Sequence, residues 1–423
     1  MRKAKQSYRN LLFLPLLVLL YACAEPLSVA NPPLPQAEQP LSWSARAGIN
    51  GLLNASVWMG QRSGYIALFA KDGELVHATT AGYADVESLS PMTLDTRVRM
   101  ASMTKPVTAV AAMILMEEGR LGLDDPVSDY IPEAASLQVA SQQQPDASGE
   151  FVLQALQQPL SVRHLLTFSS GIGSQEGEGE LVELWAANSI YRTGGSLGDR
   201  VDRILSLPLF EQPGTRWRYG WSADVLARVV EVASGQSFDA FLQQRIFDPL
   251  GMVHTSFLPP ADQRQGMASV YTQNEEGKLQ PVSYFKNDAP DWTPGGSGLV
   301  STAGDYMRFA LMLLNGGVYE DARILQSDTV AEMTHPHVKS GVLAERDIEG
   351  LGWGLGVAVA VDSEATPFGD YNGDFWWSGY YGTTFFVSPS ANMVGVVLSQ
   401  NEPAANSDDP IALYAVQGLA LMQ

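Results

Sequence analysis

The run from Val107 to Met116, VTAVAAMILM, is apolar on every side except at Thr108. A helix without a polar face lies in the interior of a fold rather than on its surface. Pro106 marks its beginning, because proline lacks an N–H group and fits only in the first turn of a helix. The rest of the chain therefore has to fold around this helix and cover it.

Ser102 and Lys105 stand immediately before this buried run. Unpaired N–H groups and the positive end of the helix dipole favour negative charge at Ser102. Residues three apart share a helical face, with Cβ atoms about 5–6 Å apart. A lysine whose pKa falls below its usual value of about 10.4 can activate a serine. Ser-x-x-Lys alone is a weak pattern and commonly a helix cap, but the buried helix favours a nucleophile.

Residues 1–22 are expected to be a signal peptide of the lipoprotein type. A basic start precedes an apolar core, residues 11–20, which is too short to span a bilayer. The segment that ends in Cys23 resembles the lipobox of bacterial lipoproteins, which implies lipidation of Cys23. Ala24 after it points, by the same resemblance, to the periplasmic face of the outer membrane. Tyr21 is bulkier than that motif usually carries, so conventional signal cleavage remains the alternative.

Residues 23–43 are predicted to be a Pro-rich, semi-rigid tether. Residues 44–423 are expected to form a single domain, because no second linker or internal repeat divides them. The chain has 46 acidic and 26 basic residues and a formal charge of −20. Such a charge repels nucleic acid and anionic lipid surfaces, so no nucleic-acid partner is expected. The oligomeric state stays open.

Strand patterns lie towards both ends of this domain, and helical patterns lie in its middle. A helix over 44–59 precedes a hairpin of 65–70 and 75–83, with Asp72-Gly73 as its turn. Further helices are predicted over 161–168, 223–233, 238–247, 306–314 and 411–421, and strands over 352–361, 375–378, 383–387 and 393–398. Residues 134–158 are polar and Gln-rich, and the acidic run at 176, 178 and 180 is expected to be a solvated loop. The fold class is α/β (α+β), an antiparallel sheet built from both chain ends with flanking helices and an inserted α-helical lobe.

Two further stretches could act together with Ser102. Tyr219 stands just before the predicted helix at 223, where its hydroxyl can face a cleft. Beside a lysine cation the pKa of a tyrosine falls from about 10, so a phenolate is a plausible base. Gly379 lies in an aromatic strand, and a glycine there often marks close approach of a ligand or another backbone. Such an edge could offer an N–H group to a substrate carbonyl oxygen.

In this order, Ser102-Met-Thr-Lys105, Tyr219-Gly-Trp221 and Trp377-Ser378-Gly379 resemble the three motifs of the β-lactamase-related serine hydrolases. This family includes class C β-lactamases, DD-peptidases and the family VIII carboxylesterases, to which the chain is most similar. The resemblance implies a β-lactamase/transpeptidase-like fold and Ser102 as the nucleophile. It also implies Lys105 and Tyr219 as proton-handling partners, and the backbone N–H groups of Ser102 and Tyr380 as the oxyanion hole.

Two positions depart from the class C pattern. Trp221 replaces an asparagine, and Trp377 replaces a lysine that helps hold the β-lactam carboxylate. Tryptophan offers apolar surface and one N–H donor but no positive charge, so a pocket of Trp221, Trp377, Ser378, Gly379 and Tyr380 suits a neutral ester. Three arginines could still supply a cation: Arg216, Arg218 and Arg308.

We therefore expect a carboxylesterase for short-chain esters that acts through an acyl-enzyme on Ser102. The alternatives are a β-lactamase or D-amino-acid peptidase, and a non-turnover lipoprotein that recognises penicillin or binds the cell wall. No G-x-S-x-G, H-E-x-x-H or phosphate-loop motif is found. His335 and His337 lack further metal ligands nearby, so no metal and no cofactor is expected. The expected partners are a small ester or lactam and, through the anchor, the membrane.

Overall fold

The computed structural model describes residues 33–174, 177–188, 190–191, 194–259, 264–282, 292–338, 349–366, 371–403, 416 and 418–421. The expected signal peptide, Cys23 and the first part of the tether lie outside these residues. Most of the helix expected over 411–421 also lies outside them, although residues 418–421 are helical. In the described part of the chain, no helix is both long and apolar enough to cross a membrane.

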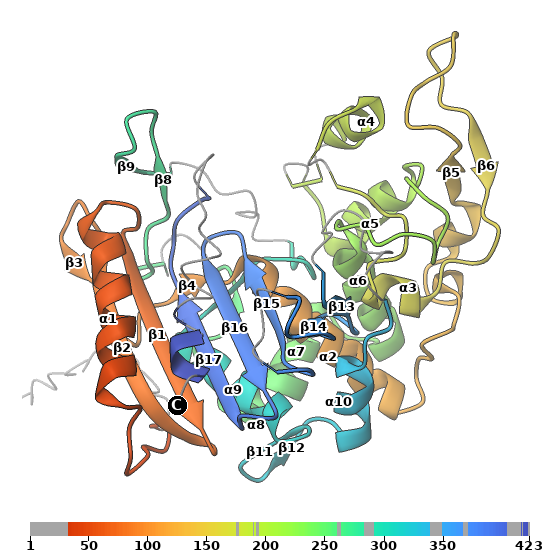
Figure 1. The fold of residues 1–423 in the computed structure, drawn as a ribbon. Helices are drawn as coiled ribbons and strands as arrows, with labels where there is room; N and C mark the ends of the chain where they lie inside the picture. The colour runs from red at the N-terminus through yellow and green to blue at the C-terminus, as the bar shows by residue number, and fades with distance from the viewer. Residues whose placement is uncertain are drawn as a thin grey trace, which may run out of the picture. The chain divides into compact units, whose positions relative to one another are not determined.

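One antiparallel sheet of eight strands joins the two ends of the chain, as predicted (Figure 1). Its order is β13-β14-β15-β16-β17-β1-β2-β3. The N-terminal strands are β1 (Gly64–Lys71), β2 (Glu74–Asp85) and β3 (Ser90–Pro91). The C-terminal strands are β13 (Leu351–Trp353), β14 (Ala358–Ala360), β15 (Phe375–Gly379), β16 (Thr383–Ser388) and β17 (Met393–Leu398). The two groups meet where β1 pairs with β17, with Leu68 opposite Val396.

Turn residues account for one correct and one wrong strand prediction. Asp72 and Gly73 have φ values of 53° and 83°, which fit the tight turn predicted between β1 and β2. The single strand predicted over 352–361 is wrong, because it divides into β13 and β14. Gly354 approaches the Met333 carbonyl so closely that a Cβ there would lie 2.1 Å from the oxygen, and Gly356 has a φ of 86°. These two glycines let the chain reverse direction.

Helices cover both faces of the sheet. Helix α1 (Trp43–Trp58) packs on β1 and β2, and α9 (Ala303–Leu314) packs on β1, β16 and β17. Figure 1 shows α1 in front of the strands and α9 behind them. Every residue of β16 and β17 is buried. A strand covered on both faces reads as a continuous apolar run rather than as an alternation, which is the pattern of β17 (MVGVVL). In β16 the apolar run is confined to its centre, between threonines and a serine that are also buried.

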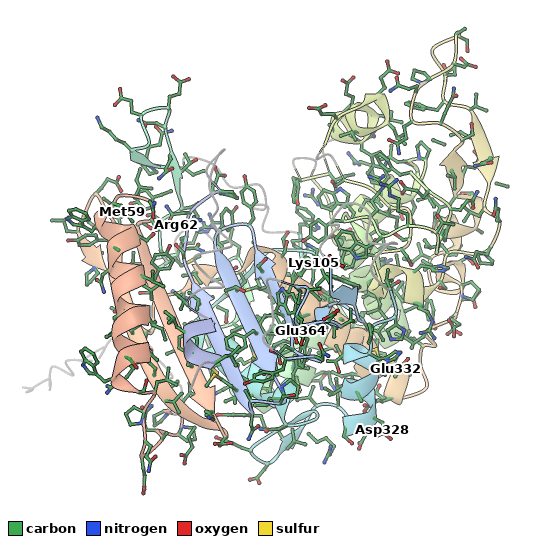
Figure 2. The ribbon with its side chains drawn as sticks, viewed as in Figure 1. Met59, Arg62, Lys105, Asp328, Glu332 and Glu364 are labelled. Atoms are coloured by element: carbon green, nitrogen blue, oxygen red, sulfur yellow. The ribbon has the colours of Figure 1, made fainter. Side chains whose placement is uncertain are left out.

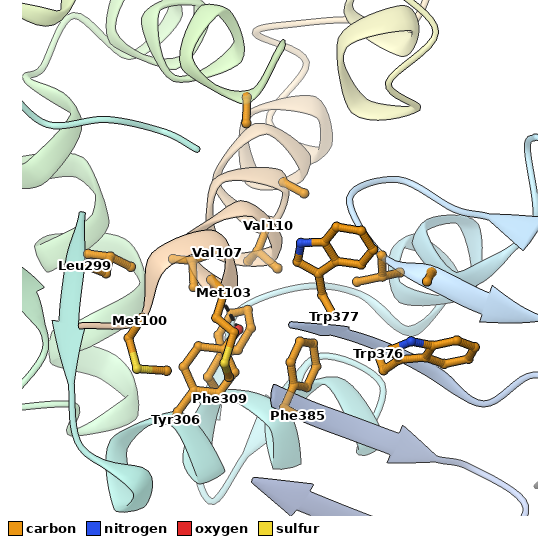
Figure 3. Close-up of a cluster of buried hydrophobic side chains, with 14 of the residues drawn as sticks. Met100, Met103, Val107, Val110, Leu299, Tyr306, Phe309, Trp376, Trp377 and Phe385 are labelled. Atoms are coloured by element: carbon orange, nitrogen blue, oxygen red, sulfur yellow. Dashed lines mark hydrogen bonds between the residues drawn. The ribbon is translucent and has the colours of Figure 1, made fainter. Parts of the chain in front are cut away.

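The predicted buried helix is α2 (Thr104–Glu117), in which all residues from 104 to 115 are buried. A 3₁₀ turn, η1 (Ala101–Met103), leads directly into it. Helix α2 packs against α6 (Ser222–Ser234) of the lobe. Figure 3 shows Met103, Val107 and Val110 near the aromatic side chains of α9 and β16, and the Tyr306 hydroxyl donates to the Met103 carbonyl at 2.8 Å. The helix therefore joins the sheet layer to the lobe.

The inserted lobe contains α6 together with α3 (Val162–Leu166), α4 (Glu180–Ala187) and α5 (Leu197–Leu205). The Gln-rich stretch forms a hairpin of β5 (Gln138–Ala140) and β6 (Leu153–Ala155). The predicted acidic loop is partly wrong, because Glu180 begins α4. An acidic residue in the first turn complements the helix dipole. Glu178 lies outside this helix, and Glu176 lies outside the described residues.

Short elements complete the fold. A second sheet has the order β4-β10-β7, made of β4 (Val98–Arg99), β10 (Leu299–Ser301) and β7 (Ser256–Phe257). Because β4 immediately precedes η1, this sheet fixes the segment that leads to Ser102. The remaining elements are η2 (Val127–Asp129), η3 (Pro132–Ser136), α7 (Phe238–Leu242), η4 (Gln243–Phe247), α8 (Asp248–Leu250), β8 (Tyr271–Gln273), β9 (Leu279–Pro281), β11 (Val318–Tyr319), β12 (Ala322–Arg323) and α10 (Ser327–Thr334).

Candidate active site

The structure brings Ser102, Lys105 and Tyr219 together around one hydroxyl group. Lys105 Nζ donates to Ser102 Oγ at 3.1 Å, and the Tyr219 hydroxyl donates to the same oxygen at 2.7 Å. Ser102 and Lys105 come from η1 and α2, whereas Tyr219 comes from the loop before α6. Two proton-bearing groups thus contact the hydroxyl that sequence analysis singled out.

The backbone before Ser102 is strained. Ala101 has a φ of 48°, a left-handed conformation that costs a non-glycine residue about 1–2 kcal/mol. Contacts on both sides hold it there. Thr104 Oγ1 donates to the Ala101 carbonyl at 2.8 Å, and the Met100 N–H donates to the Leu299 carbonyl at 2.8 Å. Strained residues that the surrounding structure maintains cluster at functional sites.

Lys105 is fixed by a second, unforeseen contact. Its side chain is buried, with 6% exposed, and Nζ donates to the Gly296 carbonyl at 2.7 Å. Nζ also lies 4.5 Å from the centre of the Tyr219 ring. Figure 2 shows Lys105 between the sheet and the helical lobe. A Cβ at Gly296 would lie 3.3 Å from Nζ and 2.7 Å from the Asp224 carboxylate. Lys105 Nζ and the Asp224 carboxylate both approach position 296 so closely that a glycine is required there.

Asp224 is a buried acid near Lys105 that sequence analysis missed. It lies in the first turn of α6 with 3% of its surface exposed. Burial raises the pKa of Asp224 from 3.8 to about 6, and the charge of Lys105 opposes this rise. One carboxylate oxygen accepts the Gly296 N–H at 3.3 Å. The sequence does contain one indication of this buried acid, because Asp224 interrupts the apolar pattern of the helix predicted over 223–233.

Aromatic side chains pack around Tyr219. Its ring centre lies 5.5 Å from that of Phe168, 6.0 Å from Trp217 and 5.7 Å from Trp377. Trp377 is 4% exposed and meets Trp353 edge-on at 4.6 Å. Figure 3 shows its indole near Val110 of α2. The predicted substrate-binding residue Trp377 thus lies mostly buried beside Tyr219, and it provides a rigid apolar wall there.

The end of β15 lies against η1. A Cβ at Gly379 would come within 2.3 Å of the Met100 carbonyl oxygen, so only a glycine permits this contact. Thr383, opposite Gly379 in β16, donates its hydroxyl to the same carbonyl at 2.9 Å. Ser378 is the preceding residue of β15, and Tyr380 follows the strand with a partly exposed side chain. The predicted close approach at Gly379 is therefore made by the backbone that leads to Ser102.

Trp221 belongs to a different aromatic cluster. It caps the start of α6, is 4% exposed, and has ring-centre distances of 4.4 Å to Tyr191 and 6.1 Å to Trp292. Its buried indole N–H has no hydrogen-bond partner in the described structure. Trp221 therefore acts first as a packing residue beneath the loop that carries Tyr219.

A cavity of about 510 Å³ begins at Tyr219 and extends into the lobe. Its walls include Ser174, Phe210, Arg216, Trp217 and Arg218. Two of the three candidate cations, Arg216 and Arg218, therefore line it. Arg308 lies elsewhere, buried in α9 and 3.9 Å from Asp305.

The ring centres of His335 and His337 lie 5.6 Å apart. His337 lies 3.6 Å from Glu332 and its ring is perpendicular to that of His335. Among the residues that the structure describes, no group of three or more His, Cys, Asp or Glu side chains could hold a metal ion.

Three features together define a β-lactamase-fold enzyme. The sheet is built from both chain ends, a helical lobe is inserted between them, and lysine and tyrosine hold a serine at the start of a buried helix. Residues 49–419 match the protein family described as Beta-lactamase. Protein Rv1367c of Mycobacterium tuberculosis (strain ATCC 25618 / H37Rv) is 31% identical over 377 residues, covering 86% of this chain and 92% of that protein. The chain belongs to the β-lactamase family, as a β-lactamase-related serine hydrolase.

Two other similar proteins carry named activities. Esterase EstB of Burkholderia gladioli is 29% identical over 372 residues, covering 83% of this chain and 88% of EstB. The solved structure of EstCE1, described as a hydrolase with promiscuous acyltransferase activity, is 27% identical with a TM-score of 0.75. The matched region covers 88% of this chain and 98% of EstCE1. These similarities support an enzyme of the serine hydrolase and acyltransferase type.

Proposed function

We propose that this enzyme is a carboxylesterase that hydrolyses short-chain esters through an acyl-enzyme on Ser102. The observation that carries the proposal is the pair of hydrogen bonds to Ser102 Oγ, at 3.1 Å from Lys105 and at 2.7 Å from Tyr219. A serine becomes an effective nucleophile when adjacent groups can accept its proton.

In the acylation step, Ser102 Oγ bonds to the carbonyl carbon of the ester, and its proton passes to the Lys105–Tyr219 pair. The carbonyl oxygen becomes an oxyanion. When the intermediate collapses, the bond to the alcohol oxygen breaks and Tyr219 returns a proton to that oxygen. Water then attacks the acyl-Ser102 ester in the same manner and releases the acid.

The oxyanion would be stabilised by the backbone N–H groups of Ser102 and Tyr380. Ser102 lies in η1 at the start of α2, and Tyr380 follows Gly379, which contacts the residues before Ser102. Fixed donors of this kind act where charge develops in the transition state, and removing one typically costs about 10²–10³ in rate.

A neutral ester fits the surface beside Trp377 better than an anionic lactam does. Trp377 is a buried apolar wall next to Tyr219, where the class C pattern has a lysine. Bringing a carboxylate against such a surface without a cation costs several kcal/mol. The similarity to Esterase EstB supports an ester as the substrate.

The test compares kcat/KM for p-nitrophenyl butyrate with kcat/KM for nitrocefin. We expect ready hydrolysis of the ester and weak or absent hydrolysis of the lactam, and Ser102→Ala should abolish both. A preference for nitrocefin would identify a β-lactamase instead. A stoichiometric burst of p-nitrophenol without turnover would identify a binding protein that acylates and stalls.

Acyl transfer is a second candidate, because EstCE1 combines it with hydrolysis. An alcohol that replaces water in the second step would take the acyl group from Ser102 and form a new ester. Product analysis of the butyrate reaction in the presence of methanol would detect methyl butyrate. If only butyrate forms at every methanol concentration, the enzyme is a hydrolase alone.

We also propose that the enzyme is exported and lipid-anchored at the bacterial cell envelope through Cys23. The support is the basic and apolar N-terminal pattern that ends in the chain's single cysteine. Radiolabelled palmitate should enter the wild type but not Cys23→Ala. Equal labelling of the two proteins, or labelling of neither, would contradict the anchor.

A further inference from the structure

Asp224 is linked to Lys105 through the backbone of Gly296. The Gly296 N–H donates to the Asp224 carboxylate at 3.3 Å, and the Gly296 carbonyl accepts a hydrogen bond from Lys105 Nζ at 2.7 Å. Both side chains are buried, with 3% of Asp224 and 6% of Lys105 exposed. One backbone residue therefore connects a buried carboxylate to the buried lysine that contacts Ser102.

The two charged groups are also close in space. A Cβ on Gly296 would lie 2.7 Å from the Asp224 carboxylate and 3.3 Å from Lys105 Nζ, so both groups approach the same point. Opposite charges within about 4–6 Å favour each other's charged form, and buried pairs are screened little by salt. The charge of Lys105 opposes the rise in the pKa of Asp224 that burial causes. Because this influence is mutual, an ionised Asp224 favours the ammonium form of Lys105.

The packing of two helices fixes this arrangement. Thr108 Oγ1 of α2 donates to the Gly295 carbonyl at 2.6 Å. On the other side, a Cβ on Gly295 would lie 2.2 Å from the Ala223 carbonyl oxygen of α6. The segment that contains Gly295 and Gly296 is therefore held between α2 and α6, and it cannot shift without separating them.

The other charged or titratable side chains of α6 and of the helices packed on it have contacts of their own or face solvent. These contacts join Arg228 to Glu231, Arg163 to Asp124, His164 to Ser161, Arg200 to the Trp292 ring, Arg203 to Asp199 and Glu117 to Gln326, while Asp202 and Asp239 are exposed. The largest charge effect on Asp224 comes from Lys105. Tyr219, whose ring centre lies 4.5 Å from Lys105 Nζ, is the titratable group on the far side of that lysine.

We propose that Asp224 is a positioning residue of the group formed by Ser102, Lys105 and Tyr219, and that its negative charge sets the pH range in which this group is active. This inference rests on the proposed esterase reaction. When the Lys105–Tyr219 pair takes the Ser102 proton, the pair gains positive charge. The Asp224 carboxylate stabilises that charge without touching the substrate.

The test is the pH profile of kcat/KM for p-nitrophenyl butyrate in the wild type and in Asp224→Asn, which keeps an acceptor for the Gly296 N–H. We expect the profile of the variant to lie about one pH unit or more lower, because loss of a nearby negative charge makes the pair release its proton at lower pH. The maximum kcat should fall by about ten-fold, since such a pair is a weaker base. KM should change little, because Asp224 is buried. Asp224→Ser removes the same charge with a smaller side chain and should displace the profile in the same direction.

Two further variants act as controls. Asp224→Glu retains the charge, so it should keep the profile at the wild-type pH even if the longer side chain lowers the rate. Asp305→Asn changes another buried aspartate in the first turn of a helix, α9, whose carboxylate accepts hydrogen bonds from Thr255 and the His254 N–H. It should lower the melting temperature and leave the profile in place. Circular dichroism would show that each variant is folded.

The pH dependence of fluorophosphonate labelling at Ser102 is a second readout, because it does not need ester turnover. We expect the same displacement in Asp224→Asn. If the wild type is labelled but does not hydrolyse p-nitrophenyl butyrate, the esterase proposal fails and the labelling profile still tests Asp224. If the variant is slower by one factor at every pH, or if its profile moves to higher pH, Asp224 is a structural residue and this inference is wrong. Absence of labelling at Ser102 would overturn both proposals.

Discussion

Ser102 Oγ accepts hydrogen bonds from Lys105 and Tyr219, and Lys105 Nζ also lies close to the Tyr219 ring. Each of the two donors therefore contacts both the nucleophile and the other donor. In such an arrangement a change at one member alters the proton position of the whole group. The group is expected to behave as a single catalytic unit.

We predict non-additive losses for this unit. Ser102→Ala, Lys105→Ala and Tyr219→Phe should each lower kcat for p-nitrophenyl butyrate by about a thousand-fold or more. The triple variant should be no worse than Ser102→Ala, because residues that act as a unit are lost together. Steady-state kinetics of the three single variants and the triple variant measure this.

A fluorophosphonate probe supplies an independent check of the nucleophile. Peptide mass spectrometry should find the adduct on the peptide that contains Ser102. An adduct on Ser378 or Ser297 would overturn the assignment, and so would losses that multiply across the three substitutions.

Asp224 makes stability depend on pH. Its folded pKa is about 6, against 3.8 unfolded, so the folded state holds this proton more tightly. The contribution of this protonated carboxyl to the free energy of unfolding is fully present below about pH 3.8. It is lost as pH rises through about 6, a change of about 3 kcal/mol. In Asp224→Asn, which keeps an acceptor for the Gly296 N–H, this part of the pH dependence should disappear.

The measurement is the difference in unfolding free energy between Asp224→Asn and wild type at several pH values. The difference should move in favour of the variant between about pH 4 and pH 6.5. A difference that stays constant across this pH range would show that burial does not raise the pKa of the Asp224 carboxyl.

The sequence is informative about site residues where the chemistry is local. Ser102 and Lys105 are found because three-residue spacing in a helix makes them neighbours, and Tyr219 is found through its motif. Asp224 and the Gly296 carbonyl are not found, because they meet Lys105 only after α6 and the segment before β10 pack on α2. No spacing in the chain encodes that contact.

At the scale of elements, the contact between β15 and η1 links the sheet to the nucleophile. Gly379 allows it, since a Cβ would lie 2.3 Å from both the Met100 carbonyl oxygen and Thr383 Oγ1. Thr383 bonds to that same carbonyl. A shift of β15 would therefore move both Tyr380 and the strained backbone before Ser102.

We predict that Gly379→Ala forces β15 away from η1. Esterase kcat should fall by about ten-fold or more, as for a weakened oxyanion donor, and the melting temperature should also fall. Gly51→Ala is the matched control, because a Cβ in this exposed part of α1 meets nothing within 4 Å. It should retain full activity and gain up to about 1 kcal/mol of stability. Full activity in Gly379→Ala would exclude this strand from the oxyanion site.

Element prediction succeeded where periodicity and turn chemistry agreed, as in α1, α2 and the β1–β2 hairpin. It failed over 352–361, where the apolar pattern hides a reversal that depends on Gly354 and Gly356 approaching α10 and α2. The β5–β6 hairpin lies in a polar stretch with exposed residues throughout β6. The β5–β6 hairpin is defined by hydrogen bonding between the backbones of its strands, which the pattern of hydrophobic residues does not reveal.

At the scale of the whole molecule, β17 is the strand that joins the two ends of the chain. It pairs with β1 on one side and with β16 on the other. All six of its residues are buried. Without it, β1 would present an unpaired apolar edge, which is a template for aggregation.

We predict that a chain ending at Asn392 is insoluble or unfolded, because it lacks β17. A chain ending at Pro403 retains the sheet but loses the buried side chains of Val416 and Ala420, so it should fold with a lower melting temperature. Soluble expression and circular dichroism distinguish the two. A folded, cooperative protein ending at Asn392 would show that the sheet does not need its central pairing.

The pairing of Leu68 with Val396 also governs when the protein can fold. A ribosome must release nearly the whole domain before β1 meets β17, so the eight-stranded sheet cannot be completed early in synthesis. Folding rates fall as contacts become more distant in sequence, and slow folding of this kind exposes apolar strands to other chains. The proposed export would benefit from this delay, because a precursor that cannot close its sheet early is still unfolded when it meets a translocation channel. We expect the same topology to make refolding from denaturant slow and dependent on protein concentration.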